Sequence, residues 1–106
     1  KMLDVIDYLN EHLTDDISID FLADTFFLSR YHLMHAFKEE TGYTIGNYLT
    51  TKRLLLARDL IQQGKPITNV CYECGFRNYS TFSRAYKKNF GSSPREQFHQ
   101  QTAHSK

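Results

Sequence analysis

Apolar residues recur at intervals of three and four positions along most of the chain, and no stretch alternates for long enough to predict a strand. The first such stripe consists of Met2, Ile6, Leu9 and Leu13, and it predicts a helix over residues 3–13. Similar spacing continues through the chain and is interrupted by short polar segments and by glycines. The pattern therefore predicts an all-α fold of seven helices.

Residues with capping chemistry mark the predicted helix boundaries. Ser18, Ser29 and Asn78 each precede an apolar stripe, where a side-chain oxygen can accept a hydrogen bond from a first-turn amide. Gly42 and Gly91 lie where a left-handed residue would close a helix. These positions predict a capped helix after Ser29 and another after Asn78.

The longest predicted helix covers residues 44–63 and stops at Gly64. Its apolar residues occupy too much of the circumference for a helix that packs on one side only, so we expect structure on both of its flanks. Near the end of the chain, Ser93 and Glu96 have the spacing of a capping box, and a proline between them suits the first helical position. They predict a final short helix.

The chain contains an internal repeat. A shift of 49 positions aligns Ser29 with Asn78, Leu33 with Phe82, Ala36 with Ala85, Phe37 with Tyr86, Lys38 with Lys87 and Gly42 with Gly91. A shift of 48 aligns Ile19, Leu22 and Ala23 with Ile67, Val70 and Cys71. Each repeat is a short helix, a turn and a capped second helix, which is the plan of a helix-turn-helix whose second helix can lie in a DNA major groove.

The outward faces of the two second helices favour DNA binding over two alternatives. One is a pair of ordinary helical hairpins packed in a bundle, and the other is a helical protein-interaction module. The first face consists of Tyr31, Met34, His35 and Lys38, and the second of Ser80, Ser83, Arg84 and Lys87. Neither face contains an acidic residue, whereas a solvated surface helix usually mixes both signs. Two such faces at matching positions suit a phosphate-lined groove.

Composition and charge narrow the class of protein. The 106 residues, 41% of them hydrophobic, suit one soluble domain, and no apolar run approaches the ~18 residues of a membrane span. The net charge of +1 conceals −6 over residues 1–48 and +7 over residues 49–106. The basic half is a candidate surface for a polyanion, although a solvated basic face is the commoner explanation of such a run.

The predicted helix 44–63 has a length that suits DNA. It would span roughly 30 Å at ~1.5 Å per residue, close to the ~34 Å between successive major-groove openings on one side of B-DNA. One chain could therefore place both second helices in adjacent turns, and a rigid linker would favour a bent site.

The sequence gives little indication of a metal site or of enzyme activity. Cys71 and Cys74 lack two further zinc ligands at suitable spacing, and Cys71 occupies the apolar position that Ala23 has in the first repeat. His32 and His35 do not have the spacing of a metalloprotease helix. Because no nucleophile, paired acid or glycine-rich phosphate loop is evident, we expect no enzyme activity, metal or cofactor.

Several motifs together carry a resemblance to a known family. They are Leu22-Ala23, Leu28-Ser29, Leu33, Phe37-Lys38, Gly42, Tyr48-Leu49, Arg53-Leu54-x-x-Ala57, Ile67-x-x-Val70 and Gly75-Phe76-x-x-x-Ser80-x-Phe82-Ser83-Arg84-x-Tyr86-Lys87-Lys88-x-x-Gly91-x-x-Pro94. Over about residues 3–98 the chain resembles the DNA-binding domain of the AraC (arabinose-operon regulator) family of transcription factors. Cys71 replaces the usual alanine, and Gln97-Phe98 replaces an aromatic-arginine pair.

The resemblance implies a single DNA-binding domain over residues 1–106, with homeodomain-like helix-turn-helix units at 18–41 and 67–90 joined by the helix 44–63. It implies base-reading roles for Tyr31, Met34, His35, Tyr79, Ser80, Ser83 and Arg84. The candidate phosphate contacts are Arg30, Lys38, Thr44, Lys52, Thr81, Lys87, Lys88, Ser93 and Arg95. The alternative to base reading for Tyr31 and Tyr79 is partial packing of the ring against the turn. The alternative to phosphate contact for each lysine is that it is a solvated surface charge.

The resemblance also implies partners and location. We expect double-stranded promoter DNA as the partner, and RNA polymerase as a further partner if the protein is an activator. We expect a monomeric domain in a full-length protein that could be dimeric, with an N-terminal effector domain outside these residues, in the bacterial cytoplasm and without membrane attachment. A further alternative is that the chain is an accessory domain of an enzyme, in which case it would bind DNA in the same way.

Overall fold

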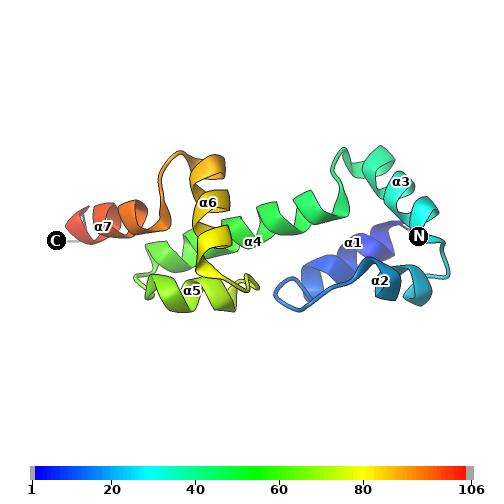
Figure 1. The fold of residues 1–106 in the computed structure, drawn as a ribbon, viewed down its shortest axis with the longest axis horizontal. Coiled ribbons are helices and arrows are strands. Elements are labelled where there is room, and N and C mark those ends of the chain that lie inside the picture. Colours follow the sequence, from blue (N-terminus) through cyan, green and yellow to red (C-terminus); the bar gives the residue numbers. More distant parts are fainter. Residues whose placement is uncertain (1, 105–106) are drawn as a thin grey trace. The chain divides into compact units, whose positions relative to one another are not determined.

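The computed structural model describes residues 2–104, and the side chains of residues 2–99. Within that part of the chain it contains seven α-helices and no strand, which confirms the predicted all-α fold (Figure 1). The helices are α1 (Met2–Glu11), α2 (Ile19–Thr25), α3 (Arg30–Thr41), α4 (Ile45–Gln62), α5 (Ile67–Glu73), α6 (Tyr79–Phe90) and α7 (Pro94–His104). They fall into two compact units, residues 1–49 and residues 50–106.

The first unit is built around α3, on which α1 and α2 both pack. Its core contains Val5 and Leu9 of α1, Leu22 of α2, and Leu33 and Phe37 of α3, all fully buried. Residues four positions apart share one side of a helix, so the two α3 residues assign one side of that helix to the core. The opposite side of α3 does not contribute to this core.

The second unit packs α5, α6 and α7 together. Val70 and Cys71 of α5 and Phe82 and Tyr86 of α6 are fully buried in its core. Burial raises the pKa of Tyr86 to about 12, so its hydroxyl remains protonated, and it donates a hydrogen bond to Oε1 of Gln97 in α7. This hydrogen bond ties α7 to α6.

Helix α4 contributes to both cores. Ile45 and Leu49 belong to the first core, whereas Leu54, Ala57 and Ile61 belong to the second. The wide apolar surface expected for this helix is therefore divided along its length, because the first two turns serve one core and the later turns serve the other. No helix among the described residues combines the length and apolar character that crossing a membrane requires.

The predicted caps are confirmed at α2, α3 and α6. In each case the side-chain oxygen of Ser18, Ser29 or Asn78 accepts a hydrogen bond, at 2.9–3.0 Å, from the amide nitrogen three residues later. Gly42 and Gly91 close α3 and α6 in the left-handed conformation, with φ of 81° and 85°. The first helix ends two residues earlier than predicted, and α4 lies one residue inside both predicted bounds.

The turn between α2 and α3 contains an unexpected residue. Phe27 has a φ of 58° and an exposed fraction of 91%, so a bulky side chain occupies a left-handed position without gaining burial. In the second unit the equivalent position is Gly75, with φ of 97°. Because a side chain destabilises the left-handed conformation by about 1–2 kcal/mol, the first turn is the more strained of the two.

The capping box at the start of α7 is also confirmed. The amide of Glu96 donates to Oγ of Ser93 at 3.1 Å, and the amide of Ser93 donates to Oε1 of Glu96 at 2.8 Å. The backbone hydrogen bond from Ser93 is the main reason that the pKa of Glu96 lies below its ordinary value. The ionised carboxylate therefore stabilises the folded form.

Lowering the pH should remove this contribution. Because the folded-state pKa of Glu96 is the lower one, its stabilisation is complete above the unfolded-state pKa of about 4.3 and is lost as the pH falls through the folded-state value. Glu96→Gln keeps an acceptor oxygen but does not titrate. Thermal unfolding followed by circular dichroism should therefore show a difference between the two proteins that shrinks on acidification. A difference that stays constant with pH would contradict this role.

Candidate nucleic-acid interface

The internal repeat is present in the structure as two helix-turn-helix units. The bounds of α2 and α5 differ by 48 positions at both ends, and those of α3 and α6 by 49 at both ends. In each unit a seven-residue helix leads through a short turn into a twelve-residue helix. Each unit therefore presents one longer helix whose outward side is available, and these two helices form the candidate interface.

On α3, the four residues predicted to face outward are all exposed. They are Tyr31, Met34, His35 and Lys38, of which the first has an exposed fraction of 71%. The rings of Tyr31 and His35 lie against each other, with centroids 3.9 Å apart. Tyr31 is therefore too exposed to be packed substantially against the turn, and its ring contacts another outward residue of the same helix.

On α6, the outward side is polar and basic. Ser80, Arg84 and Lys87 are exposed and Ser83 is half-buried. Tyr79 is half-buried, and its ring centroid lies 5.9 Å from that of Phe82 in the core. The packing alternative thus applies to Tyr79 much more than to Tyr31.

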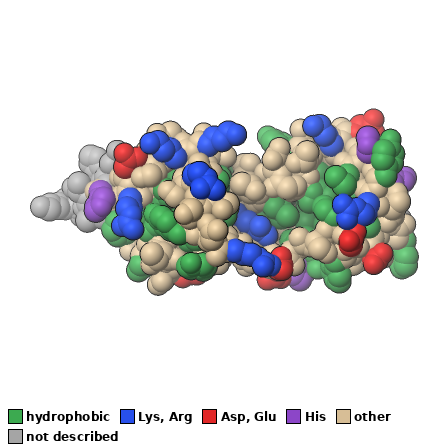
Figure 2. Space-filling model, in the orientation of Figure 1, with side chains coloured by type: hydrophobic (Ala, Val, Ile, Leu, Met, Phe, Trp, Pro, Cys, Tyr) green, Lys and Arg blue, Asp and Glu red, His purple; other side chains and the backbone are tan. Residues whose placement is uncertain are grey.

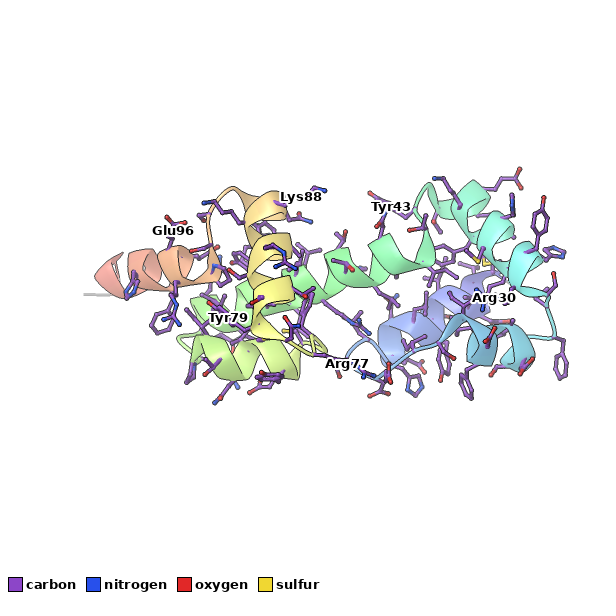
Figure 3. All side chains as sticks on the ribbon, viewed as in Figure 1. Arg30, Tyr43, Arg77, Tyr79, Lys88 and Glu96 are labelled. Atoms are coloured by element: carbon purple, nitrogen blue, oxygen red, sulfur yellow. The ribbon has the colours of Figure 1, made fainter. Side chains whose placement is uncertain are left out.

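The two helices differ in their charge. No acidic residue occurs in α6, and its last turn contains Lys87 and Lys88, the latter at the C-terminal end of the helix in Figure 3. In α3 the only lysine or arginine after the first residue is Lys38, and Glu39 and Glu40 follow it directly. The candidate interface on α6 is therefore the more positive of the two.

The residues around the two helices increase this difference in charge. Residues 2–29 include seven aspartates and glutamates and no lysine or arginine. Figure 2 shows lysine and arginine side chains mostly over the second unit, on the left of the view, and several acidic side chains over the first. Cationic attraction for a polyanion is therefore concentrated in the second unit.

Two of the candidate phosphate contacts are helix caps. Thr44 precedes α4, and its Oγ1 accepts a hydrogen bond from the amide of Asn47 at 3.1 Å. Ser93 caps α7 as described above. At each helix start, a first-turn amide that the cap leaves without a partner in the helix could donate to a phosphate oxygen.

The other candidate phosphate contacts have different environments. Arg30 donates to Oδ1 of Asp20 at 2.8 Å, in an ion pair whose two side chains are more than half exposed. An exposed pair of this kind is weak, so the guanidinium can exchange its partner. Lys52 is half-buried, and Thr81 is exposed in the first turn of α6. Arg95 is exposed, and the Cζ atom of its guanidinium lies 5.8 Å from the centroid of the Tyr79 ring.

The structure adds one basic residue that sequence reasoning missed. Arg77 is exposed in the turn immediately before α6 (Figure 3). The repeat gave no signal for it, because the turn of the second unit is one residue longer: Leu28 corresponds to Phe76, and Arg77 has no counterpart in the first unit. Its position one residue before the cap of α6 was the available signal.

The predicted core position of Cys71 is confirmed, and Cys74 is buried with it. Cys71 and Cys74 are free and fully buried in the second core. Burial raises the pKa of Cys74 to about 12, with smaller contributions from Glu73 and Cys71, so the thiol stays neutral. The described residues contain no group of three His, Cys, Asp or Glu side chains that could hold a metal ion.

Comparison with known proteins agrees with this geometry. A family model described as a helix-turn-helix domain matches residues 22–100. The HTH-type transcriptional activator RhaS of Escherichia coli is 36% identical over 90 residues, which cover 84% of this chain and 32% of that protein. The chain thus spans about a third of the length of the curated relatives that it matches.

Solved structures give the same result. The DNA-binding domain of AdpA, crystallised in complex with a target DNA, superposes with a TM-score of 0.89 at 26% identity, covering 97% of this chain and 94% of that one. A regulator with an AraC-type DNA-binding domain from Chromobacterium violaceum superposes with a TM-score of 0.79 at 30% identity, covering 94% and 90%. The chain belongs to the AraC-type helix-turn-helix family of DNA-binding domains.

Proposed function

We propose that this chain binds double-stranded DNA in a sequence-specific manner as part of a transcriptional regulator, with α3 and α6 as the recognition helices in successive major grooves. The observation that carries the proposal is the pair of exposed, acid-free helix faces at equivalent positions of α3 and α6. The DNA complex of the AdpA domain supports the same partner. The 18 residues of α4 span about 27 Å, which is shorter than the ~34 Å repeat of the groove but of the same order.

The base-reading roles follow from side-chain chemistry. Arg84 can donate two hydrogen bonds to O6 and N7 of guanine, and the apolar parts of Tyr31 and Met34 suit a thymine methyl group. His35 can donate one hydrogen bond, as can the hydroxyls of Ser80, Ser83 and Tyr79. We therefore expect the second unit to discriminate bases more sharply than the first.

The phosphate contacts set the register and the strength of binding without reading sequence. In this role we place the cationic side chains, the two helix starts and the hydroxyl of Thr81 named above: Arg30, Lys38, Thr44, Lys52, Thr81, Lys87, Lys88, Ser93 and Arg95. The domain acts without catalysis, as a monomer, in the bacterial cytoplasm. A full-length activator of this type would also contact RNA polymerase, and dimerisation would belong to residues outside this domain.

Salt dependence tests the proposal directly. Fluorescence anisotropy on a library of promoter duplexes should show log affinity falling linearly with log salt, because each neutralised phosphate releases counterions. Lys88→Ala should reduce the slope by about one, whereas Lys65→Ala, which removes an exposed lysine from the turn before α5, should leave it unchanged. An affinity that does not respond to salt would overturn the proposal.

A further inference from the structure

A cavity of about 810 Å³ opens beside the outward side of α3, entirely within the first unit. Its apolar lining includes Ile17, just before α2, Ile19, the first residue of α2, and Ile45 and Leu49 of α4. Sites for small molecules typically have volumes of about 300–1,000 Å³ and mostly apolar walls. The cavity therefore has the size and the lining of such a site.

Gly46 keeps one wall of this cavity open. It lies in the first turn of α4 at an ordinary helical φ, and a Cβ built there would meet no atom within 4 Å. Neither backbone conformation nor close packing therefore requires glycine here, although glycine is a poor helix former. Because Gly46 is part of the lining and has open space beside its Cα, a large side chain at this position has room to occupy part of the cavity.

The polar groups around the cavity are mainly hydrogen-bond donors. The ammonium group of Lys38, the imidazole of His35 and the hydroxyls of Tyr31 and Thr44 can all donate, and Glu39 is the one carboxylate in the lining. Among the described residues, no salt bridge involves Lys38. A ligand with an apolar body and an acceptor group of negative charge would satisfy both the walls and the donors.

We propose that this cavity binds a compact amphipathic carboxylate, with its apolar body on the isoleucines and its carboxylate toward Lys38. A DNA strand fills the floor of the cavity less well, because a charged phosphate has no favourable contact with the isoleucines. Four of the lining residues, Tyr31, Met34, His35 and Lys38, also form the outward side of α3. The bound carboxylate consequently competes with DNA, an effect that rests on the proposed function.

Direct binding can be measured without DNA. Phenylbutyrate is a suitable probe, observed by NMR on protein with ¹³C-labelled isoleucine and methionine methyl groups. It should shift the signals of Ile17, Ile19, Ile45 and Met34 and leave Ile61 and Ile67 of the second core unchanged. Phenylbutanol, which lacks the charge, should bind about tenfold more weakly, and Lys38→Gln should remove that difference. Absence of shifts, or equal shifts in both cores, would overturn the site.

The variants at Gly46 test the cavity itself. Gly46→Phe should abolish phenylbutyrate binding while the helical circular dichroism signal is retained, and Gly46→Ala should bind the probe as the original protein does. Phenylbutyrate should weaken DNA binding of the original protein in anisotropy and have no effect on Gly46→Phe. If phenylbutyrate binds the original protein but leaves its DNA affinity unchanged, the competition is overturned. If the original protein does not bind DNA even when phenylbutyrate is absent, only the proposed function is refuted.

Discussion

Replacing Phe82 with alanine should lower the free energy of unfolding of the second unit by about 3–5 kcal/mol, because it removes a fully buried ring and leaves a cavity. The centroid of this ring lies 5.1 Å from that of Phe76, 5.9 Å from that of Tyr79 and 5.7 Å from that of Tyr86. All three neighbours would lose contact area at once. Urea denaturation followed by circular dichroism measures the change.

Phe21→Ala is the matched control, since it makes the same substitution at a side chain with an exposed fraction of 54%. Its effect should be well under half that of Phe82→Ala. Hydrogen exchange adds a local test: the amides of α6 should exchange faster in Phe82→Ala, while those of α3, which belong to a different core, keep their protection. Equal destabilisation by the two substitutions would contradict the proposed importance of this ring.

Arg84→Ala should relax sequence discrimination by about 1–3 kcal/mol at one or two base pairs of the bound site. Arg84 is exposed on the outward side of α6, a helix without acidic residues to compete for the guanidinium. Binding sites would first be selected from random duplexes with the original protein. The affinity for every single-base substitution of the selected site would then be compared between the two proteins.

Lys87→Ala provides the contrast, because it removes a cation from the same helix without removing a planar donor pair. It should weaken binding to all duplexes by a similar factor and leave the order of preference intact. If Arg84→Ala also weakened every sequence uniformly, Arg84 would be a phosphate contact and not a base reader.

The elements that sequence reasoning predicted well are those decided by local chemistry. Ser18, Ser29 and Asn78 could be assigned as caps because the hydrogen bond spans only three residues. The division of α4 between two cores could not be predicted in the same way, since it depends on which helices pack against each end. Likewise, the hydrogen bond from Tyr86 to Gln97 joins two helices and leaves no trace in periodicity.

The turn at Phe27 shows a different limit. Phenylalanine gives no indication of a left-handed backbone, and only its alignment with Gly75 in the repeat could have suggested one. For the candidate interface, helical periodicity correctly predicted which residues of α3 face outward. It could not reveal that these residues also line a cavity, because the opposite wall comes from α4 and from the segment before α2.

The separation of the two cores has a consequence for synthesis on the ribosome. Every residue of the first core lies within residues 2–49, so this core can close before α5, α6 and α7 have been made. Most contacts within the helical units are also short in sequence, which favours fast folding. The nascent chain can therefore bury the apolar residues of α1, α2 and α3 early, and the emerging second half meets a folded neighbour instead of an exposed hydrophobic segment.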